Sequence, residues 1–167
     1  MDERLTGFII VLAAILIIVV VVVAFRSVTI IPPGKVGVEV VLGKLVEQPL
    51  TEGFHLVVPW ASIVPYDVRV SEYTMSARTQ EGAQVGNDAI GVLTKDGLTL
   101  YLDCTVLYRP RPEKVPLLHR QLGPHYVSSF VRPTIRTAIR DAAVHYAAVD
   151  IYSEKRQHYV DEVKRRL

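Results

Sequence analysis

The sequence has little of the chemistry on which enzymes and metal sites are commonly built. Its 167 residues include one cysteine, one tryptophan and two methionines. Because Cys104 has no second cysteine to pair with, no intrachain disulfide can form, and cysteine usage does not indicate a redox compartment. The net charge is only +2, with no dominant basic patch. This balance argues against a nucleic-acid-binding protein.

Catalytic motifs are also absent. The sequence contains no GxSxG, GxGxxG or P-loop pattern, and its five histidines show no metal-ligand spacing. Cys104 could be a nucleophile, but it lies in the middle of an apolar alternating segment, where thiols are usually buried and inert. We therefore expect a protein that is not an enzyme and that has no catalytic residue, no cofactor and no metal.

The most distinctive feature that is present is an apolar run at residues 5–25, LTGFIIVLAAILIIVVVVVAF, with no charge and no proline. As a helix it would extend roughly 31 Å, close to the hydrocarbon thickness of a bilayer. A core helix of a soluble domain would show a polar face, which this run lacks. The residues predicted to mark this membrane anchor are Leu5, Phe8, Ile15, Val20 and Phe25.

A signal peptide is the main alternative for this run. The run is longer than the usual h-region of 7–15 residues, the preceding tail at residues 1–4 is acid-rich, and no A-x-A-like cleavage site follows. We therefore expect a retained, single-pass anchor in a cell or inner membrane. The flanking positive charges are nearly balanced, so the side of the membrane that holds the soluble domain stays open.

Residues 26–109 are typical of a strand-rich half-domain. The segment KVGVEVVLGK alternates apolar residues from Val36 to Leu42, which predicts a strand with one buried face. Residues 98–109 alternate in the same way and predict one long strand after a tight Asp96-Gly97 turn. Shorter strands are expected at residues 28–31, 54–58, 64–71 and 89–94, and a loop at residues 77–87.

Residues 110–150 are typical of a helical half-domain. After Pro112 the apolar period changes from 2 to 3.6, which predicts a helix over residues 113–122 and another over residues 125–146 that Pro133 bends or divides. Asp150 is a candidate cap for a further helix over residues 151–167. That helix meets no glycine or proline, so we expect it to begin a long coiled coil. The predicted fold class is α+β.

Three groups of residues are candidates for contacts. Phe54 and Trp60, in EGFHLVVPW, suit the headgroup region of a bilayer, although either could equally belong to the core. Arg132, Arg136 and Arg140 recur every four residues, and could pair with acidic groups of a neighbouring subunit or form an ordinary solvated face. Tyr159 and Val163 lie on the apolar stripe of the last helix and are candidate subunit contacts.

Five segments together carry a resemblance to a known family. They are PPGKVGVEVVLGK, EGFHLVVPW, LTKDGLTLYLDCTVLYR, LGPHYVSSFVRPTIRTAIRD and IYSEKR, in that order. Over residues 28–167 the sequence resembles the SPFH (Band 7) superfamily and, within it, the prohibitins. It departs from them in length, since family members continue into a coiled coil that here would begin near residue 151.

The resemblance implies a membrane scaffold. SPFH proteins form large ring-like or cage-like assemblies with copies of themselves or of a paralogue, enclose a patch of membrane, and often accompany a membrane-bound AAA protease. By this resemblance the expected partners are the lipid bilayer, further subunits and such a protease. An accessory subunit that regulates one membrane protease, without a closed assembly of its own, is the alternative.

Overall fold

The structure, a computed structural model, describes residues 2–78 and 87–167, and gives residues 2–6 and 10 by their backbone alone. The chain falls into two compact units. Unit 1 comprises Met1–Arg69 and Pro110–Gln121, and unit 2 comprises Val70–Arg109 and Leu122–Leu167. The predicted loop at residues 77–87 lies largely outside the described residues.

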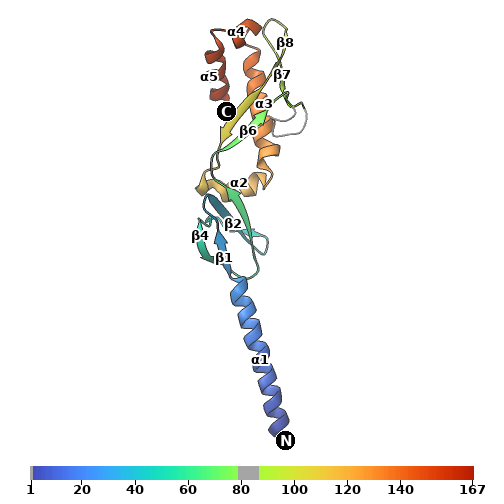
Figure 1. The fold of residues 1–167 in the computed structure, drawn as a ribbon, viewed down its shortest axis with the longest axis vertical. Coiled ribbons are helices and arrows are strands. Elements are labelled where there is room, and N and C mark those ends of the chain that lie inside the picture. Colours follow the sequence, from blue (N-terminus) through green and yellow to red (C-terminus); the bar gives the residue numbers. More distant parts are fainter. Residues whose placement is uncertain (1, 79–86) are drawn as a thin grey trace. The chain divides into compact units, whose positions relative to one another are not determined.

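Unit 1 begins with helix α1 (Asp2–Arg26), which contains the predicted apolar run (Figure 1). Valine and isoleucine dominate the helix, and their β-branched side chains are mediocre helix formers in water. In hydrocarbon, however, a helix satisfies every backbone amide internally, and this requirement favours the helix whatever the side-chain propensity. The predicted helix is present in the structure.

The strands of unit 1 form two small antiparallel sheets. Strand β1 (Val28–Ile31) pairs with β4 (Gly53–Leu56), and a second sheet has the order β3–β2–β5. The strands of the second sheet are β3 (Lys44–Leu45), β2 (Lys35–Val41) and β5 (Ala61–Asp67). Val36 and Val38 are buried, which confirms the predicted buried face of β2.

Two details of unit 1 differ from the sequence prediction. Leu42 was predicted to continue the buried face of β2, but it lies in the turn before β3 with φ of +49° and is exposed. The strand predicted over residues 64–71 instead spans residues 61–67. Pro65 is tolerated because β5 is the edge of its sheet, where a missing N–H breaks no ladder on the outer side.

A short helical segment from later in the chain completes unit 1. The 3-10 turn η1 (Pro112–Lys114) leads into α2 (Val115–Leu122), as predicted for residues 113–122. The Tyr66 hydroxyl of β5 lies 2.6 Å from Nδ1 of His119 in α2, and the two rings meet edge to face. This hydrogen bond joins segments that are far apart in the sequence.

Unit 2 is a long two-stranded ribbon covered by helices. Strand β6 (Ser71–Met75) pairs with β9 (Cys104–Tyr108), and β7 (Ile90–Leu93) pairs with β8 (Thr99–Leu102), both antiparallel. The Asp88 N–H donates to the Ser76 carbonyl at 2.9 Å, so β6 and β7 lie on the same side of the segment formed by β8 and β9. The predicted turn is present, with Gly97 at φ of +78°.

The strand predicted over residues 98–109 is divided at Asp103. Its carboxylate accepts hydrogen bonds from the Ala77 N–H at 2.9 Å and the Ser76 hydroxyl at 3.3 Å. Asp103 therefore binds the residues that follow β6 instead of continuing the strand. The prediction of one uninterrupted strand was wrong because this partner lies 26 residues away in the sequence.

The helices of unit 2 follow the ribbon. A π-helical turn η2 (Val127–Val131) leads into α3 (Arg132–Ala143), so the predicted helix is divided just before Pro133. Two further helices follow, α4 (Ala148–Tyr152) and α5 (Arg156–Arg166). Asp150 lies inside α4 and pairs with Lys155 at 3.0 Å, so the predicted cap was wrong.

The core of unit 2 lies between the ribbon and the helices. It consists of buried apolar side chains from both: Tyr73, Met75, Ile90, Val92, Ile135, Ala138, Ile139, Ala142, Ala143, Ile151, Tyr159 and Val163. The alternating strand positions and the three- and four-residue helix spacing meet in this one cluster. The fold class is α+β, as predicted.

Candidate functional site

One face of the β1–β4 pair is apolar and exposed. Val28 lies opposite Leu56, and Ile30 lies opposite Phe54. These four side chains expose 43%, 75%, 73% and 62% of their surface respectively, although large apolar side chains at cross-strand positions usually cover one another or a core. A patch of this kind on a small sheet is typical of an interaction surface. We call these four residues the β1–β4 face.

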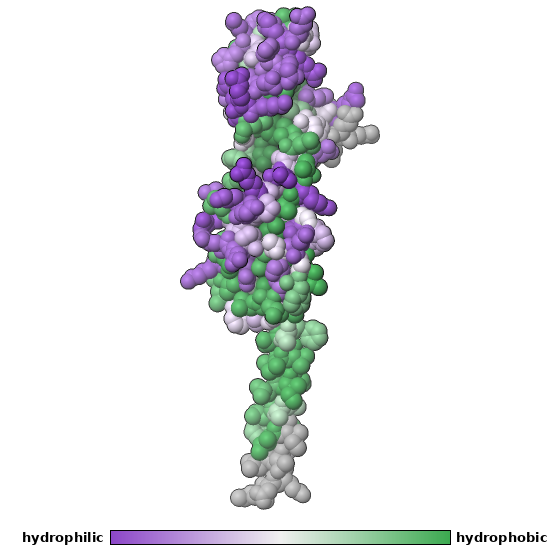
Figure 2. Space-filling view, turned by 90° about the vertical axis from the view of Figure 1, so that its left-hand side faces the viewer, coloured by the Kyte–Doolittle hydropathy of each residue, from purple (hydrophilic) through white to green (hydrophobic). Residues whose placement is uncertain are grey.

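The β1–β4 face adjoins the apolar helix through a single residue, Ser27. The Ser27 N–H and hydroxyl donate to the Val23 carbonyl of α1 at 3.1 and 2.9 Å. Its own carbonyl accepts from the Val57 N–H at 2.8 Å. Figure 2 shows hydrophobic surface over α1 that continues onto the adjoining end of unit 1.

The two residues predicted to contact a bilayer both lie in this region of unit 1. Phe54 belongs to the β1–β4 face, and Trp60 follows β4 with 60% of its surface exposed. The alternative that they are ordinary core residues is therefore wrong for the described chain. Sequence reasoning missed Ile30 and Leu56, because strand alternation does not reveal which face is buried.

The predicted anchor residues lie on α1. Phe8, Ile15, Val20 and Phe25 are all exposed, and the side chain of Leu5 is outside the described part. Within the described residues, one helix is long and apolar enough to cross a membrane, over Gly7–Arg26. Length and composition carry this result, and a signal sequence near the N-terminus would give the same one.

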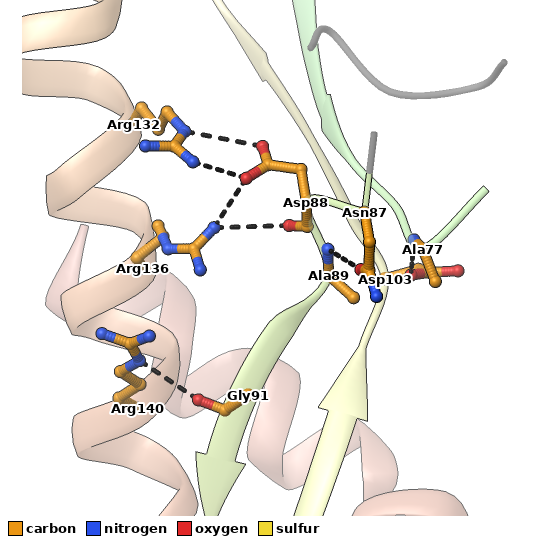
Figure 3. A network of polar contacts seen from close by, with 9 residues as sticks. All are labelled: Ala77, Asn87, Asp88, Ala89, Gly91, Asp103, Arg132, Arg136 and Arg140. Carbon is orange, nitrogen blue, oxygen red and sulfur yellow. Dashed lines mark hydrogen bonds and ion pairs between the residues drawn. The ribbon is translucent and has the colours of Figure 1, made fainter. Parts of the chain in front are cut away.

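The arginines of α3 bind the ribbon of their own chain (Figure 3). Arg132 lies 2.5 Å and Arg136 2.9 Å from Oδ1 of Asp88, whose side chain is 7% exposed. Arg140 donates from Nε to the Gly91 carbonyl of β7 at 3.1 Å. The hydrogen bond to Asp88 and its negative charge raise the pKa of Arg132, so the guanidinium stays charged.

These contacts revise the interpretation of the arginine row. A solvated face is wrong for Arg132 and Arg136, which are largely covered, while Arg140 is exposed. Pairing with a neighbouring subunit stays a prediction, but Arg132 and Arg136 already have an acidic partner within unit 2. Sequence reasoning missed Asp88, since 44 residues separate it from Arg132.

Tyr159 and Val163, predicted as subunit contacts, belong to the core of unit 2. The Tyr159 hydroxyl donates to the Ile139 carbonyl at 3.0 Å, and its ring meets Tyr146 edge to face. Burial raises the pKa of Tyr159 to about 12. Both side chains thus hold α5 against α3 in the described chain.

An apolar groove of about 620 Å³ runs through unit 2 along β9. Residues 102–108 line one wall, and side chains of η2, α3, α4 and α5 line the other. Cys104 lies in this wall, and burial raises the pKa of its thiol, which keeps it protonated at neutral pH. Among the described residues, no group of three or more His, Cys, Asp or Glu side chains is placed to hold a metal ion.

Comparison with known proteins places the chain in a family. A family model described as SPFH domain / Band 7 family matches residues 29–167. The chain belongs to the SPFH (Band 7) family. The match covers the strands and helices of both units and begins just after α1, so the resemblance in the sequence is confirmed at the level of the superfamily. No curated protein matches the chain.

Proposed function

We propose that this SPFH protein is a prohibitin-like membrane scaffold that is not an enzyme. In this proposal α1 is a retained anchor and the β1–β4 face lies in the headgroup region of the same bilayer. Many copies pack side by side into a large ring or cage that encloses a membrane patch and organises the proteins within it, including an AAA protease.

The β1–β4 face is the observation that supports the proposed membrane contact. Its four apolar residues adjoin α1 through Ser27, so a bilayer that holds the helix lies within reach of the sheet. Burying them in an interface would remove apolar surface from water, which contributes roughly 25 cal/mol per Å². Trp60 suits the same depth because its ring is apolar and its N–H can still reach water.

The fluorescence of the single tryptophan tests the membrane contact. The full chain is placed in vesicles whose lipids carry bromine at a shallow acyl position, and Trp60 emission is compared with that in unlabelled vesicles. We expect clear quenching, and a blue-shifted emission maximum. A matched variant, Trp60→Phe with Val20→Trp, reports the quenching of a residue inside the membrane. Emission from Trp60 that ignores the quencher would contradict the proposed contact.

The mass of the native particle tests the assembly. A scaffold predicts a particle in mild detergent far larger than the 18.6 kDa chain, and imaging should show a closed ring or cage. A protease that copurifies with only a few copies of the chain would instead support the accessory-subunit alternative. A monomer or dimer without partners would contradict both.

Charge reversal at Arg136, the direct test of subunit pairing, needs a folding control. Arg136→Glu would place a second carboxylate beside Asp88 and disturb unit 2 itself. Arg140→Glu is the better variant, since Arg140 is exposed and donates to a backbone carbonyl. An unchanged particle mass in that variant would remove Arg140 from the proposed interface. Protease protection in sealed vesicles would establish the side of the membrane.

A further inference from the structure

The two long edges of the unit 2 ribbon are treated differently. On the edge formed by β6 and β7, α3 supplies Arg136 to the Asp88 carbonyl at 3.3 Å and Arg140 to the Gly91 carbonyl (Figure 3). Such cover prevents an edge strand from pairing with a foreign chain. On the opposite edge, β9 has no second strand among the described residues.

The apolar groove follows this open edge. Every residue from 102 to 108 lines it, including those whose side chains point away from the core, whereas no residue of β6 contributes among the described residues. The groove is therefore on the side of β9 away from β6. Its opposite wall is apolar, with Phe130 and Val160 among the lining residues. An edge strand facing a helix across an apolar groove is an arrangement that accepts an extended peptide as an added strand.

One cation in the groove lining has no partner among the residues that the structure describes. Arg156 lines it at the start of α5, and its side chain makes no ion pair or hydrogen bond with any described residue. The other cation in the lining, Lys164, lies 3.8 Å from Asp161. A ligand that supplies a carboxylate near Arg156 would complement this charge.

We propose that the groove between β9 and α5 binds an extended segment of a partner protein that alternates apolar side chains and carries an acidic one. The segment pairs with the outer edge of β9, places apolar side chains against α3 and α5, and sets its carboxylate against Arg156. This inference goes beyond the scaffold proposal, because the groove lies within unit 2 and requires neither a ring nor a protease.

A peptide with the sequence of residues 70–76, VSEYTMS, is a suitable probe. This sequence already pairs with β9 on its other edge, and it contains both alternating apolar residues and a glutamate. Fluorescence anisotropy of the labelled, end-blocked peptide is measured against the full chain in lipid nanodiscs. We expect saturable binding, and slower hydrogen exchange at the β9 amides in the complex. A peptide N-methylated at alternate amides cannot form the ladder and should bind at least tenfold more weakly.

Matched variants separate the groove from the rest of the ribbon. Phe130→Lys places a charge in the groove wall opposite β9 and should weaken binding at least tenfold, whereas Tyr101→Lys, on β8 and outside the lining, should not change it. Both residues are exposed, at 50% and 73%, so neither change should unfold the chain. Arg156→Gln should weaken binding about fivefold, and should have no effect on the peptide VSQYTMS, which lacks the carboxylate.

Three results would overturn the proposal. These are the absence of saturable binding, equal binding of the N-methylated peptide, and equal loss in the Phe130→Lys and Tyr101→Lys variants. A particle mass that falls in Phe130→Lys, with no peptide binding to wild type, would assign the groove to a second copy of the chain instead. Because Trp60 quenching does not involve unit 2, failure here leaves the membrane contact to its own test.

Discussion

Asp88 binds two arginines of α3 to the ribbon of unit 2. One carboxylate oxygen meets two guanidinium groups, and the residue's backbone carbonyl meets one of them again. The desolvation of these charges is offset only while all three are present. Loss of the carboxylate leaves two partly covered cations facing each other.

We predict that Asp88→Asn lowers the free energy of unfolding by about 2–4 kcal/mol, because it removes the counter-charge but keeps the shape. Thermal and urea unfolding of the full chain in mild detergent, followed by circular dichroism, measures the change. Asp161→Asn is the matched control, since Asp161 is exposed and its surface pairs contribute little, below about 0.5 kcal/mol. Equal effects of the two changes would contradict a special role for Asp88.

Tyr159 gives a prediction on pH. Its pKa of about 12 in the folded chain lies above the ordinary value near 10, so its contribution is complete below about pH 10 and is lost as the pH rises through 12. We expect Tyr159→Phe to cost about 1 kcal/mol at neutral pH through the lost hydrogen bond to Ile139. The stability of this variant should fall less than that of wild type between pH 10 and 12. Unfolding midpoints against pH measure both, and parallel curves would contradict the assignment.

At the scale of elements, periodicity predicted those that depend on their own residues. The β1 segment, the buried face of β2, the hairpin at Gly97 and the break before Pro133 are in this class, because β-branched runs, a residue with positive φ and a missing N–H act locally. The division at Asp103 could not be predicted. A lone aspartate between apolar residues looks like an outward-facing strand residue until Ala77 is placed beside it.

The packing of strand β2 provides a prediction at this scale. A Cβ added at Gly37 would lie 2.8 Å from Cδ1 of Ile31 and 3.0 Å from Cγ2 of Ile63. We expect Gly37→Ala to destabilise unit 1 by about 1–3 kcal/mol, because a close-packed site has to open. At Gly91 the added Cβ would sit 3.5 Å from the Tyr101 ring, an ordinary contact, so Gly91→Ala should be nearly neutral. Hydrogen exchange of the β2 and β7 amides compares the two, and similar losses at both would contradict the argument.

At the scale of the whole molecule, the two units are each built from two stretches of chain. Residues 110–121 return to unit 1 after the ribbon of unit 2 has been completed. No sequence pattern indicated this, because the bond that carries it, from Tyr66 to His119, joins residues 53 positions apart. The candidate membrane surface was predicted in part, since Phe54 and Trp60 stood out by residue type, whereas the groove emerged only from the packing of α5 beside β9.

The anchor proposed for α1 leads to a prediction for the whole chain. Val20→Arg places a charge in the apolar run, at a cost of about 2.5–3.5 kcal/mol for membrane insertion. We expect a clear loss of chain from the alkali-resistant membrane fraction, while Val20→Leu should remain there as wild type does. Equal retention of the arginine variant would contradict a spanning helix.

In the proposed membrane arrangement, Ser27 couples the β1–β4 pair to α1. Its N–H donates to carbonyls of α1 and its carbonyl accepts from the Val57 N–H, so one residue is hydrogen-bonded to both the helix and the segment after β4. A helix that is too long for a thin bilayer tilts, and a tilt of α1 would change the orientation of the β1–β4 pair. Membrane thickness would then determine the depth of that sheet in the headgroup region. The chain would therefore bind differently to thick and thin regions of one membrane.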